Sequence, residues 1–157
     1  MHFLIISFSL LVGLTIACTG SSDLSSDKLE SNEAKIISVE ASGTDRAFSF
    51  SVGISSPDTG CDQYADWWEV LSLEGTLLYR RILAHSHVNE QPFIRSGGPI
   101  TIAADRTVWI RAHMNPEGYG KQVYKGSVND GFAQAELPVD FAIEVAGQDP
   151  LPDGCDF

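Results

Sequence analysis

The alternation that decides the fold is clearest in residues 46–55, which read RAFSFSVGIS. Every second position from the first phenylalanine onward is large and apolar: Phe48, Phe50, Val52 and Ile54. Successive side chains of a β-strand point to opposite faces of the sheet. The period of two therefore predicts a strand with one face on a core and the other face small and polar.

Similar patterns recur on both sides of this stretch, separated by turns that contain Gly, Pro, Asp or Ser. Strands are predicted at residues 35–41, 64–73, 76–84, 100–103, 107–114, 121–128 and 137–145. The polar stretch 85–99 contains two prolines and the pair Gly97-Gly98, so it is predicted to be a connecting loop. No long stretch has the 3.6-residue period of a helix. The pattern predicts an all-β fold, an antiparallel sandwich of about seven strands.

Two stretches resemble known sandwich domains. Residues 66–70 read DWWEV, and residues 108–113 read VWIRAH and are followed by NPEGYG at 115–120. In these stretches the chain resembles fibronectin type III and immunoglobulin-like domains, over about residues 35–146. The resemblance implies that the predicted strands 76–84 and 107–114 flank strand 64–73 in one sheet. A jelly roll or another β-sandwich fits the pattern nearly as well, and a fold alone does not fix a function.

The N-terminal stretch points to secretion and a lipid anchor. Residues 3–17 contain no Asp, Glu, Lys or Arg, and this length suits the core of a secretory signal better than a membrane-spanning helix. The stretch ends in LTIA and Cys18, where it resembles the bacterial lipoproteins, whose signal peptides end in a lipobox. The resemblance implies that residues 1–17 are a cleaved signal peptide and that Cys18 is acylated. The alternative is an ordinary signal peptide and a plain thiol at Cys18.

The same resemblance gives an expected location. A mature chain anchored by several acyl chains is held stably at a membrane, which places this protein at the bacterial cell envelope. Residue 19 is Thr and not Asp, which in the enterobacterial sorting rule favours the outer membrane. The Ser-rich residues 18–34 are expected to be a lipidated tether between the anchor and the domain.

The cysteines fit an oxidising compartment. The chain has three cysteines, and if Cys18 carries lipid, Cys61 and Cys155 remain as a pair. A disulfide between them would tie the acidic residues 147–157 back to the domain. The alternatives are two free thiols or a metal-binding pair, although no CxxC spacing supports a metal.

The charge argues against nucleic acid as a partner. The sequence has 21 Asp and Glu against 10 Lys and Arg, a formal net charge of −11. A surface this acidic repels phosphate backbones, and no basic stripe interrupts it.

Three histidines form a candidate metal site. His85 and His87 are two residues apart and point the same way in an extended chain, and His113 lies on a strand predicted to be in the same sheet. Neutral imidazole is a common ligand of Cu and Zn. The alternative is that the first two lie in a solvated loop and His113 is an ordinary strand residue.

An aromatic surface is the second candidate site. Its predicted members lie on neighbouring strands: Tyr64, Trp67, Tyr79 and Trp109. Exposed flat rings flanked by carboxylates suit a glycan or a protein partner. The alternative is that these rings pack on the two faces of the sheet.

Sequence motifs of common enzyme classes are absent: there is no GxSxG, no HExxH and no glycine-rich phosphate loop. We therefore expect a lipid-anchored, non-catalytic binding module of the cell envelope that needs no cofactor and recognises an envelope protein or a glycan. The alternative function is Cu or Zn binding through the three histidines.

Overall fold

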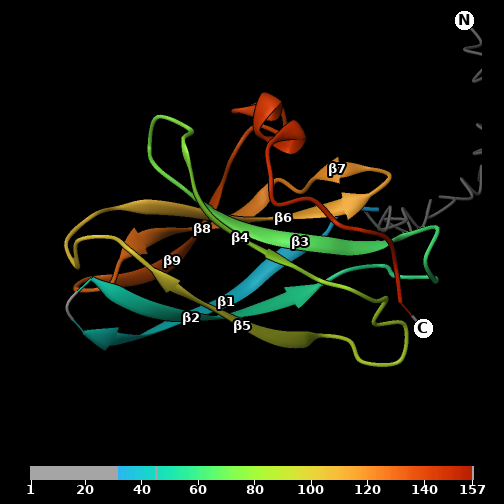
Figure 1. Ribbon diagram of the computed structural model, residues 1–157, viewed down its shortest axis with the longest axis horizontal. Helices are drawn as coiled ribbons and strands as arrows, with labels where there is room; N and C mark the ends of the chain where they lie inside the picture. Colours follow the sequence, from blue (N-terminus) through green and yellow to red (C-terminus); the bar gives the residue numbers. More distant parts are fainter. Residues whose placement is uncertain (1–31, 45, 157) are drawn as a thin grey trace, which may run out of the picture. The chain divides into compact units, whose positions relative to one another are not determined.

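The protein folds into two antiparallel β-sheets packed face to face, as shown by the computed structural model in Figure 1. The structure describes residues 32–44 and 46–156. The smaller sheet has the order β1 (Lys35–Thr44), β2 (Ala47–Ser55), β5 (Phe93–Ile100). The larger sheet has the order β4 (Leu77–Ile82), β3 (Tyr64–Leu71), β6 (Val108–Asn115), β8 (Gln122–Ser127), β9 (Gly131–Glu136), and β7 (Gly118–Tyr119) pairs with β6. The predicted all-β sandwich is confirmed.

The core lies between the two sheets. The four alternating apolar residues of β2 are all at most 5% exposed, as their pattern predicted. They face Trp68 on β3, which is fully buried, and the inward residues of β6, namely Val108, Ile110, Ala112 and Met114. Burying a large apolar side chain contributes about 1.5–3 kcal/mol, so this layer supplies most of the driving force for folding.

Strand β3 is covered on both faces, because all eight of its residues are buried. One face packs on the smaller sheet. The other lies beneath residues 137–156, called here the covering segment, which contains the 3-10 helix Ile143–Gly147. Figure 1 shows this segment in red on the side of β3 and β6 that faces away from β1, β2 and β5. The buried side chains of Leu137 and Val145 fix it there.

The strand predicted at residues 137–145 is wrong. Most of this stretch forms turns and the 3-10 helix, and the edge of the sheet is taken instead by β9. The alternation of apolar residues does not mark a half-buried strand, because Val139 and Ile143 are 38% and 56% exposed. The carbonyl groups of this stretch accept hydrogen bonds from buried arginines of the sheet below and not from a neighbouring strand.

The predicted loop at residues 85–99 is also wrong in its second half, where β5 forms. Of the short strand predicted at residues 100–103, only Ile100 lies in a strand, as the last residue of β5. Strand β5 has little apolar alternation and leaves Ile94 60% exposed, so it depends on backbone pairing with β2. Gly97 lies so close to the core that an added Cβ would come within 2.6 Å of the Tyr79 hydroxyl and 2.9 Å of the Trp68 ring. The glycine pair therefore serves close packing and not a loop.

Strands β4 and β6 flank β3 in one sheet, as predicted. The specific identity of the fold as fibronectin type III or immunoglobulin-like stays a prediction. The signal peptide at 1–17, Cys18 and most of the predicted tether at 18–34 lie outside the described residues. Within the part of the chain that the structure describes, no helix is long and apolar enough to cross a membrane.

Candidate functional site

A buried charge network lies on the outer face of the larger sheet. Glu69 of β3 is fully buried, and its partners in register are Arg80 on β4 and Arg111 on β6. One carboxylate oxygen of Glu69 accepts from Nε and Nη2 of Arg80, at 2.8 and 2.6 Å. The other accepts from Nε of Arg111 at 2.7 Å. A single carboxylate thus holds two guanidinium groups.

The covering segment provides the remaining acceptors for both arginines. Arg111 donates to the carbonyl oxygens of Phe141 and Ala142, at 2.6 and 3.2 Å. Arg80 donates to three further carbonyl oxygens, those of Val145, Gln148 and Pro150, at 2.8, 2.6 and 3.1 Å. Two buried positive charges face one negative charge, so these five carbonyl dipoles stabilise the excess charge and fix the segment in place.

The sequence does not predict this network. Glu69 shares a strand face with Trp67, and Arg111 shares one with Trp109. That these charges are neighbours becomes evident only when the register between the three strands is known. Charged residues are seldom fully buried unless they are paired, so the default expectation for each of them was exposure.

An aromatic and histidine cluster adjoins this network. The His113 ring stacks on Trp67, with centroids 3.7 Å apart and planes 6° apart, and Tyr119 meets the same ring edge-on at 4.9 Å. Asp66 Oδ1 lies 2.7 Å from His113 Nδ1. Because an ionised carboxylate only accepts hydrogen bonds, Nδ1 is the donor, and in a neutral ring Nε2 carries the free lone pair.

Arginines of the buried network cover the aromatic rings. The guanidinium carbon of Arg111 lies 3.4 Å from the Tyr119 ring centroid, and that of Arg80 lies 4.5 Å from Trp67. Burial and the nearby carboxylate of Glu69 raise the pKa of Tyr119 to about 12, so its phenol stays protonated at neutral pH. Tyr119 therefore packs as an aromatic ring of the cluster and does not act as a base.

A groove of about 430 Å³ opens beside this cluster, between β7 and the covering segment. Its first side is formed by His113, Glu117, Tyr119, Lys121 and Glu33, and its second side by Val139, Ile143 and Ala146. We call it the β7 groove. One wall is apolar and partly exposed, and the other offers two carboxylates and an imidazole. This volume lies in the usual range for small-molecule sites.

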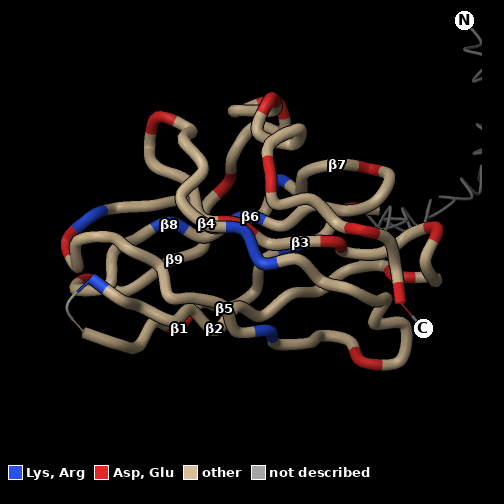
Figure 2. The backbone as a smooth tube through the Cα atoms, in the orientation of Figure 1, with Lys and Arg blue, Asp and Glu red and all other residues tan. Residues whose placement is uncertain are grey.

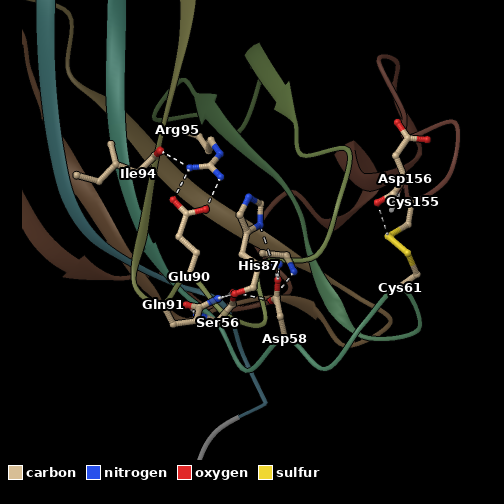
Figure 3. Close-up of polar contacts among 11 residues, drawn as sticks. Ser56, Asp58, Cys61, His87, Glu90, Gln91, Ile94, Arg95, Cys155 and Asp156 are labelled. Carbon is tan, nitrogen blue, oxygen red and sulfur yellow. Dashed lines mark hydrogen bonds and ion pairs between the residues drawn. A yellow bond between two sulfur atoms is a disulfide. The ribbon is translucent and has the colours of Figure 1, made fainter.

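A second cluster surrounds His87 in the loop after β4 (Figure 3). The His87 ring is stacked on Phe93 at 3.7 Å and lies 4.6 Å from the ring of His85. Asp58 accepts from the His87 backbone amide at 2.7 Å, whereas neither ring nitrogen of His87 has a hydrogen-bond partner among the described residues. Burial lowers the pKa of His87, and Arg95 and His85 lower it further. His87 is thus held as a neutral ring.

The predicted metal set gains no support from this arrangement. His85 and His87 lie together in one loop, while His113 lies on β6 and is bound to Asp66 of β3. Across residues 32–44 and 46–156, no group of three or more His, Cys, Asp or Glu side chains is placed to hold a metal ion.

The four aromatic residues of the predicted binding surface do not share one exposed face. Tyr64 and Trp67 are each only 4% exposed. Tyr79 turns toward the core, where its ring lies 5.6 Å from Trp68 and its hydroxyl accepts from the Gly98 amide. Trp109 is half-buried on the outer face, under the ammonium group of Lys125.

The predicted disulfide is present between Cys61 and Cys155, whose Cα atoms are 5.5 Å apart. It joins the loop between β2 and β3 to the covering segment, as Figure 3 shows. The Asp156 amide also donates to the Ala84 carbonyl at 2.6 Å. Residues 147–156 are therefore part of the packed domain.

Comparison with known proteins shows a similarity to a curated protein. The chain is 34% identical over 120 residues to a protein of Halomicrobium mukohataei named "Putative lipoprotein". The matched region is 76% of this chain, which spans 59% of the length of that relative. No family model and no solved structure matches the chain.

Proposed function

We propose that this protein is a lipid-anchored, non-catalytic interaction module of the cell envelope. The observation that carries the anchor is the 34% identity to a protein whose name calls it a lipoprotein, together with the apolar stretch that ends at Cys18. The relative's name does not specify a membrane, and the preference for the outer membrane rests on Thr19 alone.

The β7 groove supports the interaction role. It combines a partly exposed apolar wall with fixed hydrogen-bond acceptors, which is the composition of a recognition site. The residues that line it include no Ser, Thr or Cys that His113 could activate as a nucleophile. The partner would be an envelope protein or a glycan.

The test of the anchor is fractionation of host cells that express the full chain. We expect the wild-type protein in the membrane fraction and in the detergent phase, with a mass that corresponds to loss of residues 1–17 and addition of lipid. Cys18→Ser should release the protein from membranes. Cys155→Ser is the matched control, because it makes the same substitution in the Cys61–Cys155 disulfide and keeps Cys18. Equal membrane retention of Cys18→Ser and the wild type would overturn the proposal.

A further inference from the structure

We infer that the β7 groove binds a positively charged side chain, Lys or Arg, that is flanked by apolar residues and presented by a protein partner. The inference rests on the proposed interaction role and names the chemistry of the partner. Three properties of the groove carry it: its free acceptors, the charge around it and its apolar wall.

The groove is rich in acceptors. Glu33 accepts the Lys121 amide through Oε2 at 3.3 Å, and Glu117 accepts Gln63 through Oε1 at 2.8 Å. The second oxygen of each carboxylate has no partner among the described residues. Asp66 fixes His113 Nδ1 as a donor, so Nε2 of a neutral His113 adds a third acceptor. Cationic donors are the natural complement of such a set.

The charge of the groove and of the segment beside it favours the same partner. In the lining, the two carboxylates of Glu33 and Glu117 outnumber the ammonium group of Lys121. The covering segment contains five acidic residues, no Lys and no Arg: Asp140, Glu144, Asp149, Asp153 and Asp156. All five are exposed, and none forms an ion pair with another described residue. Figure 2 shows the resulting red stretches without blue along this segment. Such a field attracts cations and repels acidic or phosphorylated partners.

The apolar wall distinguishes a protein segment from a free cation. Val139 and Ile143 expose 38% and 56% of their surface, and Ala146 continues the wall beside them. Lys and Arg bury their aliphatic stems on apolar surfaces and keep the charged end on acceptors. A bare metal ion would leave this wall uncovered. A glycan would need exposed rings for stacking, and Trp67 is buried.

The test uses the purified full chain in a neutral detergent and three fluorescent peptides, with the detergent alone as the blank. The peptides are GLKFRLG, the charge-matched GSKGRSG and the apolar, acidic GLEFELG. We expect saturable binding of the first peptide only, measured by fluorescence anisotropy and weakened by NaCl. Saturable binding of the charge-matched peptide with equal affinity would reduce the effect to net charge and overturn the inference. So would equal binding of the acidic peptide, or no binding at all.

Variants locate the site. Ile143→Ser should weaken binding of GLKFRLG about 10-fold, because an Ile-sized apolar contact is lost. The double change Glu33→Gln and Glu117→Gln should weaken it roughly 3–10-fold. Ile94→Ser is the matched control, since Ile94 is 60% exposed but lies on β5 of the other sheet. Equal loss in this control would overturn the inference. Peptide binding does not depend on Cys18, so failure here and failure of the anchor test are separate results.

Discussion

Single residues set the stability of the outer face, and Glu69 is the clearest case. It neutralises one of two buried guanidinium groups, and no other carboxylate of the described residues forms an ion pair with them. Glu69→Gln keeps the shape of the side chain but leaves Arg80 and Arg111 without an ionic partner. We expect the free energy of unfolding, measured by urea titration, to fall by about 3–5 kcal/mol. The reason is that breaking a buried ion pair leaves the remaining charge buried without a partner.

The matched control is Glu90→Gln. Glu90 also forms a close pair with an arginine, at 2.8 Å from Arg95, but its side chain is 58% exposed. Water screens such a pair, so little change is expected. Equal losses from the two variants would show that the network on the outer face is not buried as described.

His87 gives the protein a defined pH dependence. Burial, Arg95 and His85 lower its pKa below 6.5, and the carboxylates of Asp58 and Glu90 oppose this only in part. The folded state then binds fewer protons than the unfolded state. Its stability is therefore complete above about pH 6.5 and is lost as the pH falls toward the folded-state pKa.

The variant His87→Leu isolates this effect. The ring nitrogens have no hydrogen-bond partners in the part of the chain that the structure describes, so an apolar side chain of similar size should cost little at pH 7.5. We expect the variant to gain stability relative to the wild type as urea titrations move from pH 7.5 to pH 5.5. Val123→Ala, a buried change without a titrating group, should keep a constant difference. A constant difference for His87→Leu as well would refute the assignment.

At the scale of elements, β5 depends on close packing at Gly97. Gly97→Ala places a Cβ within 2.6 Å of the Tyr79 hydroxyl and 2.9 Å of the Trp68 ring. We expect a loss of about 1–3 kcal/mol in the free energy of unfolding, because the core must shift to admit the methyl group. Gly147→Ala is the control, since nothing lies within 4 Å of an added Cβ there. Tolerance of both changes would contradict the observed packing of β5.

The covering segment is held by two independent devices, the disulfide and the arginine contacts. The paired change Cys61→Ala and Cys155→Ala should lower the free energy of unfolding by about 2–5 kcal/mol. The amide of Asp156, bonded to Ala84, should lose its protection from hydrogen exchange. The amide of Gln148, which donates to the Val145 carbonyl, should stay protected, because Arg80 still holds the carbonyls of both residues. Simultaneous loss of both protections would mean that the disulfide alone holds the segment.

The elements also show what sequence could predict. The strand β2, with strong alternation, is predicted with its correct buried face, and β6 with nearly its correct bounds, because burial on one side of a strand places apolar residues at every second position. Strands β5 and β9 are not predicted, because backbone pairing with β2 and β8 forms them and their side chains lack a clear apolar alternation. Residues 137–145 alternate like a strand but form turns and a 3-10 helix. Their carbonyl groups accept hydrogen bonds from Arg80 and Arg111, whose positions follow from strand register and leave no pattern in this stretch.

The candidate site was harder to predict than the fold. The sequence identified His113, Trp67 and Tyr64 as residues of interest, but the structure buries the two aromatic residues and places His113 beside Asp66. The apolar wall of the β7 groove comes from Val139 and Ile143, which the alternation had assigned to a strand. A groove formed by segments distant in sequence leaves no local pattern.

For the molecule as a whole, the net charge of −11 predicts a salt dependence of stability. The exposed carboxylates of the covering segment repel one another, and raising the salt from 0.01 to 0.1 M shortens the Debye length from about 30 to about 10 Å. We expect the free energy of unfolding, measured by urea titration, to rise with NaCl. The combined change Asp140→Asn, Glu144→Gln and Asp149→Asn should flatten this dependence. A wild-type stability that falls with salt would contradict the prediction.

The position of the covering segment also affects how the protein is made. Residues 137–156 leave the ribosome after every strand of both sheets, yet they carry the carbonyl groups that Arg80 and Arg111 require. At typical rates of synthesis, Cys155 follows Cys61 by about 5–20 s. During that interval the two arginines of the nascent sheet lack the carbonyl acceptors that the covering segment provides. Secretion machinery that delays folding, or a chaperone that shields this face, would therefore protect the chain when it is most prone to aggregate.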